Sequence, residues 1–310
     1  MDFAINQEVI NWLLEGDPSI KWQTLRNLCS VPESEIEKER SKIESEGWGK
    51  RLLSFQDPSG TWNNGLYTPK WTSTTYTLLL LRRLGIKPNE KCRKGCQLLL
   101  DNGLYKDGGI NLWKTKKVSE TCVTGMVFGI LSYFQFDDER LEKIFQYLVE
   151  NQMSDGGWNC QYPYGATHAS FHTTLLVLEA LYEYSKFTTL KKDQIEKMQQ
   201  DAHEFLLKHR LFRSHRTGKV VDSKMLRLSF PPRWRYNILT SLDYFQAVNH
   251  PYDERLTDAI EIIRKKEKNS KWTLQEKHQG KTWFEMERAG TPSRWNTLRA
   301  LRVLKWWEKF

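Results

Sequence analysis

Four titratable side chains stand near the starts of two apolar, helix-like segments. Glu120 and Cys122 open ETCVTGMVFGILSYF, and His168 and His172 open HASFHTTLLVLEALYEY. Imidazole exchanges protons near neutral pH, and a helix N-terminus lowers the pKa of a thiol placed there. These residue types therefore predict an acid–base or thiol centre that Glu120, Cys122, His168 and His172 share.

The spacing of these residues bears on how they meet. Glu120 and His168 are 48 residues apart, which is the step of an internal repeat, so both should lie at the same end of neighbouring helices. His168 and His172 are four residues apart, so they should share a helical face. Glu120 and Cys122 are two residues apart, a spacing that does not share one face of a helix, so one of them must lie in the N-terminal turn. The alternative is structural: Cys122 fills core space, Glu120 caps its helix with Ser119, and the imidazoles are satisfied polar groups.

Three glycine turns reveal the repeat that must position these side chains. The turns are QDPSGTWNN, KDGGINLW and QMSDGGWNC, and their glycines Gly60, Gly108 and Gly156 follow one another at even steps of 48 residues. Trp62 and Trp158 match across two steps. Even spacing over three units predicts a stack of equal supersecondary units.

Helix-like segments of two kinds separate the turns. Five are apolar on most sides and are predicted inner helices: 71–85, 120–134, 168–184, 233–245 and 293–307. Three are amphipathic, with acidic starts and basic ends, and are predicted outer helices: 138–152, 192–209 and 253–268. With further helices before Gly60, the pattern predicts an all-α chain of about six helix hairpins. We expect one domain over 1–310, an N-terminal hairpin within 1–45, and a basic insertion loop at 207–232.

Charge and cysteine usage narrow the partners and the compartment. The formal net charge is +9, which attracts anions, including acidic membrane surfaces. Nucleic acid is not expected as a partner, because the aromatic residues are periodic and are not interleaved with the basic ones. Five cysteines and a start without a signal sequence predict a cytoplasmic protein without disulfides. The sequence does not indicate an oligomeric state.

A repeated motif carries a family resemblance. The spacing Gln-x-x-x-Gly-x-Trp occurs twice, as Gln56, Gly60 and Trp62 and as Gln152, Gly156 and Trp158. It resembles the repeated Gln-Trp motif of squalene and oxidosqualene cyclases, and so indicates the squalene cyclase and protein prenyltransferase superfamily over roughly residues 45–310. The resemblance implies a single (α/α) toroid in which the glutamine ties a helix end to the turn and the tryptophan stacks on the next unit.

The two branches of that superfamily imply different chemistry. The Asp-x-Asp-Asp acid motif of the cyclases has as its nearest counterpart the run from Gln135 to Asp138, where an amide replaces the first carboxylate, so a cyclase with the usual acid is disfavoured. The prenyltransferases hold zinc with an Asp-x-Cys pair and a later histidine. Glu120, Cys122 and His172 are similar, with Glu in place of Asp. The resemblance thus implies a Zn²⁺ ion with an open fourth position, beside the metal-free alternative.

Two further groups are predicted to bind substrate. Arg233 and Arg235 follow the basic insertion and suit anion capture, with a solvated basic loop as the alternative. Aromatic residues near the inner-helix starts suit the lining of an apolar cavity, or ordinary core packing. These aromatic residues are Trp71, Tyr76, Trp234, Tyr236 and Trp295.

The patterns together favour an enzyme that acts in a central cavity. The substrate would be a small hydrophobic or isoprenoid-like molecule with an anionic group, and the resemblance suggests transferase, cyclase or lyase chemistry. One alternative is a non-catalytic toroid that binds a ligand or a protein. Another is a prenyltransferase β-like subunit that needs a partner subunit.

Overall fold

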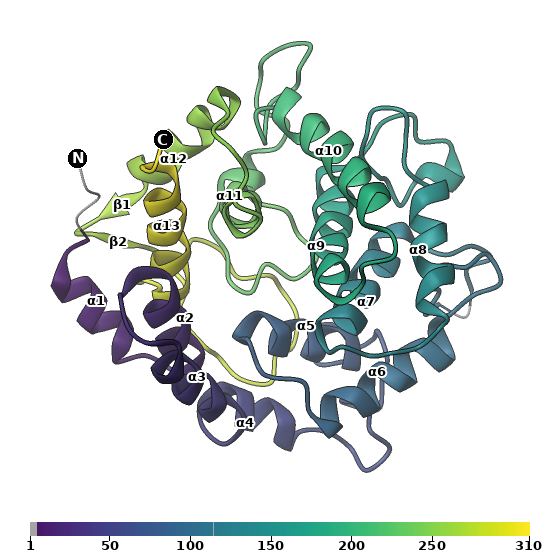
Figure 1. Ribbon diagram of the computed structural model, residues 1–310, viewed down its shortest axis with the longest axis horizontal. Helices are drawn as coiled ribbons and strands as arrows, with labels where there is room; N and C mark the ends of the chain where they lie inside the picture. The colour runs from purple at the N-terminus through teal and green to yellow at the C-terminus, as the bar shows by residue number, and fades with distance from the viewer. Residues whose placement is uncertain (1–4, 114) are drawn as a thin grey trace. The chain divides into compact units, whose positions relative to one another are not determined.

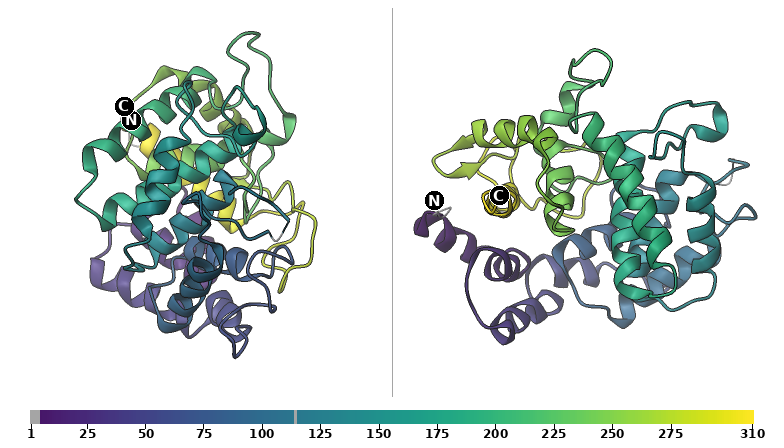
Figure 2. Two further views of the ribbon diagram at one scale, coloured as in Figure 1. Left: turned by 90° about the vertical axis from the view of Figure 1, so that its right-hand side faces the viewer. Right: turned by 45° about the horizontal axis from the view of Figure 1, so that its top comes forward.

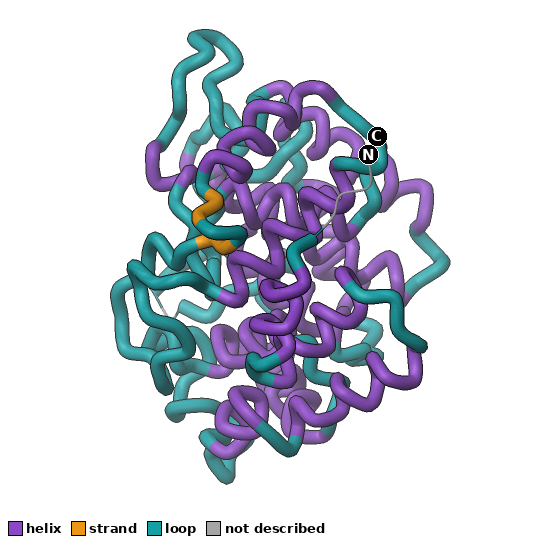
Figure 3. Tube along the Cα trace, turned by 90° about the vertical axis from the view of Figure 1, so that its left-hand side faces the viewer, coloured by secondary structure: helices purple, strands orange, loops and turns teal. Residues whose placement is uncertain are grey.

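The computed structural model describes residues 5–113 and 115–310 (Figure 1). Residues 1–4 and 114 of the predicted domain 1–310 lie outside the described part. Helices dominate, and the strands of the described residues form one short antiparallel hairpin, β1 (Glu267–Lys268) and β2 (Lys271–Trp272) (Figure 3). The predicted all-α class is confirmed. Within the described residues, no helix has both the length and the apolar character that crossing a membrane requires.

The contacts divide the chain into two compact units. Unit 1 combines the N-terminal segment up to Ser54 with Arg83–Lys87 and His209–Phe310. Unit 2 combines Phe55–Arg82 with Pro88–Lys208. The single domain, and the closure of its hairpins into one ring, stay predictions.

Unit 2 holds the helices that follow the three glycine turns. They are α5 (Thr74–Leu84, whose last two residues belong to unit 1), α6 (Glu90–Gly103), α7 (Thr121–Tyr133), α8 (Leu141–Glu150), α9 (Phe171–Phe187) and α10 (Lys192–Lys208), with a 3₁₀ turn, η2 (Tyr162–Tyr164). Figure 1 shows α7 and α9 side by side. A Cβ atom on Gly129 of α7 would lie 3.2 Å from the Cα of Ala180, so glycine permits the close approach of these helices.

The glycine turns share one backbone geometry. Gly60, Gly108 and Gly156 have φ of 93°, 85° and 94°, a region that side chains other than glycine rarely adopt. The Gln56 amide donates to the carbonyl oxygen of Gly60 at 2.9 Å, and that of Gln152 to Gly156 at 2.7 Å. The turns are therefore tied to the preceding helix ends at both glutamines.

A threonine from the following helix secures each turn. In unit 2 the backbone N–H of Trp62, Ile110 and Trp158 donates to Thr74, Thr124 and Thr174, at 3.0, 2.9 and 3.0 Å. The same bond recurs in unit 1, where the N–H of Trp272 donates to Thr297 at 3.0 Å. The repeat seen in the sequence thus has a physical counterpart in four turns.

Unit 1 brings the two ends of the chain together. Its helices are α1 (Gln7–Leu14), α2 (Pro18–Leu28), α3 (Glu33–Ser41), α4 (Gly47–Ser54), α11 (Ile238–Ala247), α12 (Thr257–Lys265) and α13 (Arg294–Trp307), with the 3₁₀ turns η1 (Lys42–Glu44), η3 (Ser223–Leu226) and η4 (Glu254–Leu256). Helix α13 packs against α2, α11 and β2 (Figure 2). The predicted insertion at 207–232 starts in the last two residues of α10 and continues as a loop that contains η3.

Candidate functional site

Glu120 and Cys122 lie at the start of α7. Glu120 is the N-cap residue but makes no side-chain capping bond, and Cys122 lies in the first turn, as its spacing from Glu120 required. The Glu120 carboxylate instead accepts a hydrogen bond from Trp113 Nε1 at 2.5 Å and pairs with the Lys116 ammonium. The alternative in which Glu120 caps its helix with Ser119 is therefore wrong. Ser119 donates its hydroxyl to Asp107 at 2.6 Å.

Cys122 is hydrogen-bonded to a second thiol, that of Cys160. Both cysteines are free, and Cys160 follows the glycine turn that precedes α9. Donation from the Cys122 thiol, helped by Thr173 and Gln161, lowers the pKa of Cys160 to about 6, and the same bond together with burial raises the pKa of Cys122. Near neutral pH the pair therefore holds a thiolate at Cys160 with a thiol beside it.

The two histidines do not share a helical face. Helix α9 begins at Phe171 because the Ser170 side chain caps it by accepting from the N–H of Thr173. His168 precedes the helix and is exposed, whereas His172 is half-buried in the first turn. The prediction of a shared face at a four-residue spacing is wrong for this reason.

The predicted zinc ligands are Glu120, Cys122 and His172. Among residues 5–113 and 115–310, no three His, Cys, Asp or Glu side chains are grouped so that they could hold a metal ion. Both oxygens of the Glu120 carboxylate already face N–H donors, from Lys116 and Trp113. The described residues therefore do not fit a Zn²⁺ site of Glu120, Cys122 and His172.

Aromatic side chains form a continuous cluster that ends at Glu120. Trp71 meets Tyr76 edge to face at 4.8 Å between ring centroids, and the Tyr76 hydroxyl donates to that of Tyr67 at 3.0 Å. Tyr67 meets Trp113 at 5.3 Å, and Trp113 donates to Glu120. Trp71 and Tyr76 thus come together as part of this cluster, which also includes Tyr67 and Trp113.

Sequence reasoning missed Tyr67, Trp113 and the role of Cys160, all of which lie in loops. Burial raises the pKa of Tyr67 far above its usual range, with further contributions from Tyr76, Cys122 and Glu120. The Tyr67 hydroxyl is therefore close enough to Cys122 and Glu120 to respond to their charge. We call Glu120, Cys122, Cys160, Tyr67 and Trp113 the thiol–aromatic site.

The other predicted binding residues belong to unit 1. Arg233 is buried at φ 59°, and Arg235 is exposed with its guanidinium 4.9 Å from the ring centroid of Trp234. The Tyr236 hydroxyl donates to the Leu211 carbonyl at 2.7 Å. Trp295 stacks on the ring of Phe230 at 4.1 Å between ring centroids. These contacts hold the loop to its unit, and the substrate roles of these residues stay predictions.

One histidine near this loop has an unusual environment. Burial, followed by the charges of Arg235 and Arg233, lowers the pKa of His278 to about 4. His278 is therefore neutral at physiological pH. Sequence reasoning missed it because it stands in a polar loop, 275–290, without a periodic pattern.

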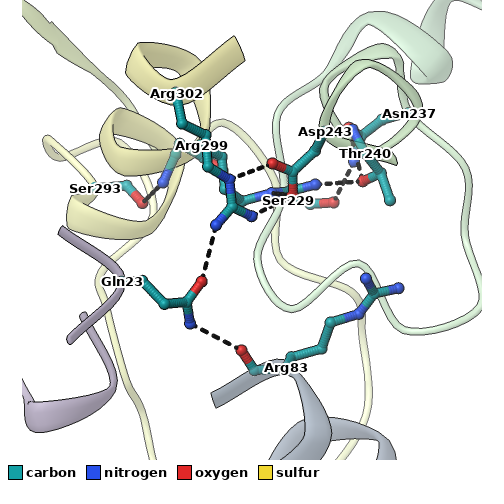
Figure 4. Close-up of polar contacts among 10 residues, drawn as sticks. Gln23, Arg83, Ser229, Asn237, Thr240, Asp243, Ser293, Arg299 and Arg302 are labelled. Atoms are coloured by element: carbon teal, nitrogen blue, oxygen red, sulfur yellow. Dashed lines mark hydrogen bonds and ion pairs between the residues drawn. The ribbon is translucent and has the colours of Figure 1, made fainter. Parts of the chain in front are cut away.

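A buried ion cluster links α11 and α13 in unit 1 (Figure 4). Asp243 accepts from Arg299 Nε at 3.0 Å, and from Arg302 Nε and Nη2 at 2.5 and 2.6 Å. Arg299 Nη2 donates to Thr240 at 2.9 Å, and Arg302 Nη1 to Gln23 at 2.9 Å. The available sequence signal was a pair of arginines three apart in the apolar segment 293–307.

Comparison with known proteins gives structural neighbours alone. No family model matches the chain, and no curated protein matches it. The chain is similar to the type II terpene cyclase MstE from Scytonema at 16% identity and a TM-score of 0.45, over 94% of this chain and 88% of that one. It is also similar to a variant of that cyclase in complex with geranylgeranyl dihydroxybenzoate, at 15% identity and a TM-score of 0.46, over 93% of this chain and 86% of that one. A protein from Actinoplanes is similar at 15% identity and a TM-score of 0.47, over 94% of this chain and 90% of that one. At these values the similarities assign neither a family nor a function.

Proposed function

We propose that this chain is an enzyme that acts on a small hydrophobic, isoprenoid-like molecule at the thiol–aromatic site, by transferase, cyclase or lyase chemistry. The observation that carries the proposal is the contact of the Cys160 thiol with the Cys122 thiol at the start of α7, where Glu120 and the aromatic cluster also lie. Reactive thiols and ionisable groups beside apolar surface are typical of active sites.

The residues divide the chemistry among them. The faces of Tyr67 and Trp113 attract positive charge that develops on a bound hydrocarbon chain, and the Glu120 carboxylate, itself paired with Lys116, orients the Trp113 ring by accepting from its N–H. The Cys160 thiolate accepts a proton from the substrate and becomes a thiol, and before that transfer the Cys122 thiol stabilises the thiolate by donation. The repeated motif at Gln56 and Gln152 supports the isoprenoid class through its resemblance to the cyclases.

The free thiols also bear on the compartment. None of the five cysteines, all of which lie within the described residues, forms a disulfide, and Cys92 and Cys96 are buried. This supports the cytoplasm as the place where the enzyme works. We keep association with acidic membranes as part of the proposal, because the net charge is +9.

Ligand protection of Cys160 tests the proposal. Iodoacetamide alkylation of the full chain would be followed by mass spectrometry at increasing geranylgeraniol concentration. We expect geranylgeraniol to protect Cys160 from alkylation in a saturable way. Trp113→Leu should raise the concentration for half-maximal protection at least tenfold, because that change removes an aromatic face and the donor to Glu120.

The control is Trp12→Leu, which removes an aromatic ring from unit 1, where Lys271 and Arg294 lie over it. In this variant, geranylgeraniol should protect Cys160 at the same concentrations as in the unchanged chain. Absence of protection in the unchanged chain would contradict an isoprenoid-like substrate. If Cys160 is protected but no product forms from allylic isoprenoid substrates, the non-catalytic binding toroid would be favoured. The partner-subunit alternative has its own test: a native mass that shows a stable monomer would argue against an obligate partner.

A further inference from the structure

The buried ion cluster of unit 1 carries more positive than negative charge. Arg299 and Arg302 share the single carboxylate of Asp243, and the exposed fractions of the three side chains are 4%, 16% and 10%. Arg83 adds to the positive potential, because its charge and that of Arg302 contribute to lowering the pKa of Arg299, after burial. Buried charges are usually balanced by charges of opposite sign. Two guanidiniums on one carboxylate leave one positive charge uncompensated within this trio.

One nitrogen of the cluster has no acceptor. Arg299 Nε donates to Asp243 and Nη2 donates to Thr240, but Nη1 is buried and has no hydrogen-bond partner among the described residues. The residue as a whole is 3% exposed. Buried side-chain donors nearly always have a partner, and a guanidinium N–H is among the most costly to leave without one.

The acceptors nearby are already in use. The Asp243 oxygens accept from both arginines, Thr240 in turn donates to Asn237 at 3.1 Å, and Gln23 accepts from Arg302. Figure 4 shows these side chains between α11 and α13 with Gln23 reaching in from α2. Because no described residue accepts from Nη1, an acceptor from outside the protein would satisfy it, and the surplus charge favours an anion over water.

We propose that Arg299 Nη1, within the cluster of Asp243, Arg299 and Arg302, binds a small oxyanion. The guanidinium fork presents parallel N–H groups that match the oxygens of a phosphate or a similar oxyanion, which a compact halide does not use as well. The oxyanion is either a free phosphate or the anionic end of a larger hydrophobic ligand. The proposal is independent of the thiol–aromatic site, because it requires neither the thiols nor a hydrophobic substrate.

The test is the thermal unfolding of the full chain in graded sodium phosphate, against sodium chloride of equal ionic strength. We expect a saturable rise in Tm with phosphate that chloride does not reproduce. Arg299→Lys keeps the charge but removes Nη1, and it should weaken the phosphate midpoint at least tenfold. The matched control is Arg302→Lys, which alters the other arginine of Asp243, whose three nitrogens all have protein partners. It should lower the starting Tm and keep the phosphate midpoint within about threefold.

A second variant guards against misfolding as the explanation. Gln23→Glu is close to isosteric and adds a carboxylate next to Arg302 Nη1, so it should abolish the phosphate response while the chain still unfolds cooperatively. Dodecyl phosphate separates the two sources: tighter, competitive binding relative to inorganic phosphate indicates the anionic end of a hydrophobic ligand, and equal affinity indicates a free oxyanion. Equal midpoints for Arg299→Lys and the unchanged chain, or equal responses to chloride and phosphate, would overturn the proposal.

Discussion

Asp243 illustrates how a single buried carboxylate organises several elements. It receives three hydrogen bonds from α13, and through Arg302 it connects α11 to Gln23 of α2. Burial opposes the charge of Asp243, yet the guanidiniums of Arg302 and Arg299 hold its pKa below the usual value. The carboxylate is therefore ionised at neutral pH and unsuited to the role of a general acid.

Removing this carboxylate should be costly. Asp243→Asn leaves two guanidiniums buried without a counterion, which we expect to lower the free energy of unfolding by about 3–5 kcal/mol. Urea denaturation followed by circular dichroism measures it. Asp138→Asn is the comparison, because its pair with Arg140 is partly exposed and should cost less than about 1 kcal/mol. Similar losses in both variants would show that the cluster of Asp243 is not electrostatically special.

The second residue-scale prediction concerns the pH dependence of Cys160. Since hydrogen bonding lowers its pKa to about 6, the rate of alkylation by iodoacetamide should rise through pH 6 and level off above about pH 7. Cys122→Ala removes the main donor and should move that midpoint upward by at least one pH unit. Mass spectrometry of each cysteine gives the rates.

Cys96 supplies the internal control, because burial raises the pKa of its thiol and it should not react in the folded chain. An alkylation midpoint of Cys160 near pH 8.5 in the unchanged chain would contradict the thiol pair.

At the residue scale, the sequence predicted part of the site. The pattern selected Cys122 and Glu120 of the thiol–aromatic site, and Trp71 and Tyr76 of the aromatic cluster beside it, because they stand at the starts of apolar helical segments. Cys160 could not be selected as the partner of Cys122, because a contact between a loop and a helix start 38 residues away leaves no periodic trace. The shared face predicted for the two histidines failed because a serine cap moved the start of α9.

At the scale of elements, the glycine turns are the most sharply defined feature. Gly156 has φ 94°, and a Cβ atom there would lie 2.2 Å from the carbonyl oxygen of Asp201. Gly165 has φ 92°, but nothing lies within 4 Å of the corresponding position. The two glycines therefore separate backbone strain from steric overlap.

Alanine at these two positions should have different effects. Gly165→Ala is expected to cost about 1–2 kcal/mol, the penalty of a left-handed residue with a side chain. Gly156→Ala should cost about 1–3 kcal/mol more, because the turn must move away from α10. Urea unfolding of both variants measures the difference. Equal costs would show that the contact with Asp201 relaxes freely.

The helices themselves were largely predictable. Apolar runs located α5, α7, α9, α11 and α13, because long runs of this kind need burial on most sides. Their starts were less well predicted: the segment expected from Arg233 becomes helical at Ile238, since Asn237 caps α11 by accepting from the N–H of Thr240. A cap is a single side-chain choice, and the hydrophobic pattern does not contain it.

At the scale of the whole molecule, unit 1 depends on segments far apart in the chain. Arg294 of α13 donates to the carbonyl of Trp12 at 2.9 Å, and Lys305 donates to that of Asn27 at 3.0 Å. Sequence periodicity indicates which faces are apolar, but it does not indicate which distant helix covers them. The grouping into two units was not visible in the sequence for that reason.

This arrangement predicts how fragments behave. Residues 209–310 alone lack α2 and should show little helical circular dichroism, whereas adding residues 1–54 as a separate chain should restore helical signal and a cooperative thermal transition. The fragment 55–208 contains all of unit 2 together with the short segment Arg83–Lys87 of unit 1, and it should fold without residues 1–54 or 209–310. A fully helical 209–310 fragment would contradict the dependence of unit 1 on its N-terminal segment.

The threonine that secures each turn has a consequence for engineering. Thr74, Thr124, Thr174 and Thr297 each accept the same backbone hydrogen bond from a turn. The connection between turn and helix is therefore the same in all four places, although the loops between them differ in length and composition. Chimeras that exchange a whole glycine turn together with the helix that follows it should fold more readily than chimeras whose junction lies within a helix. New loops of chosen length and chemistry can then be installed between fixed anchor points.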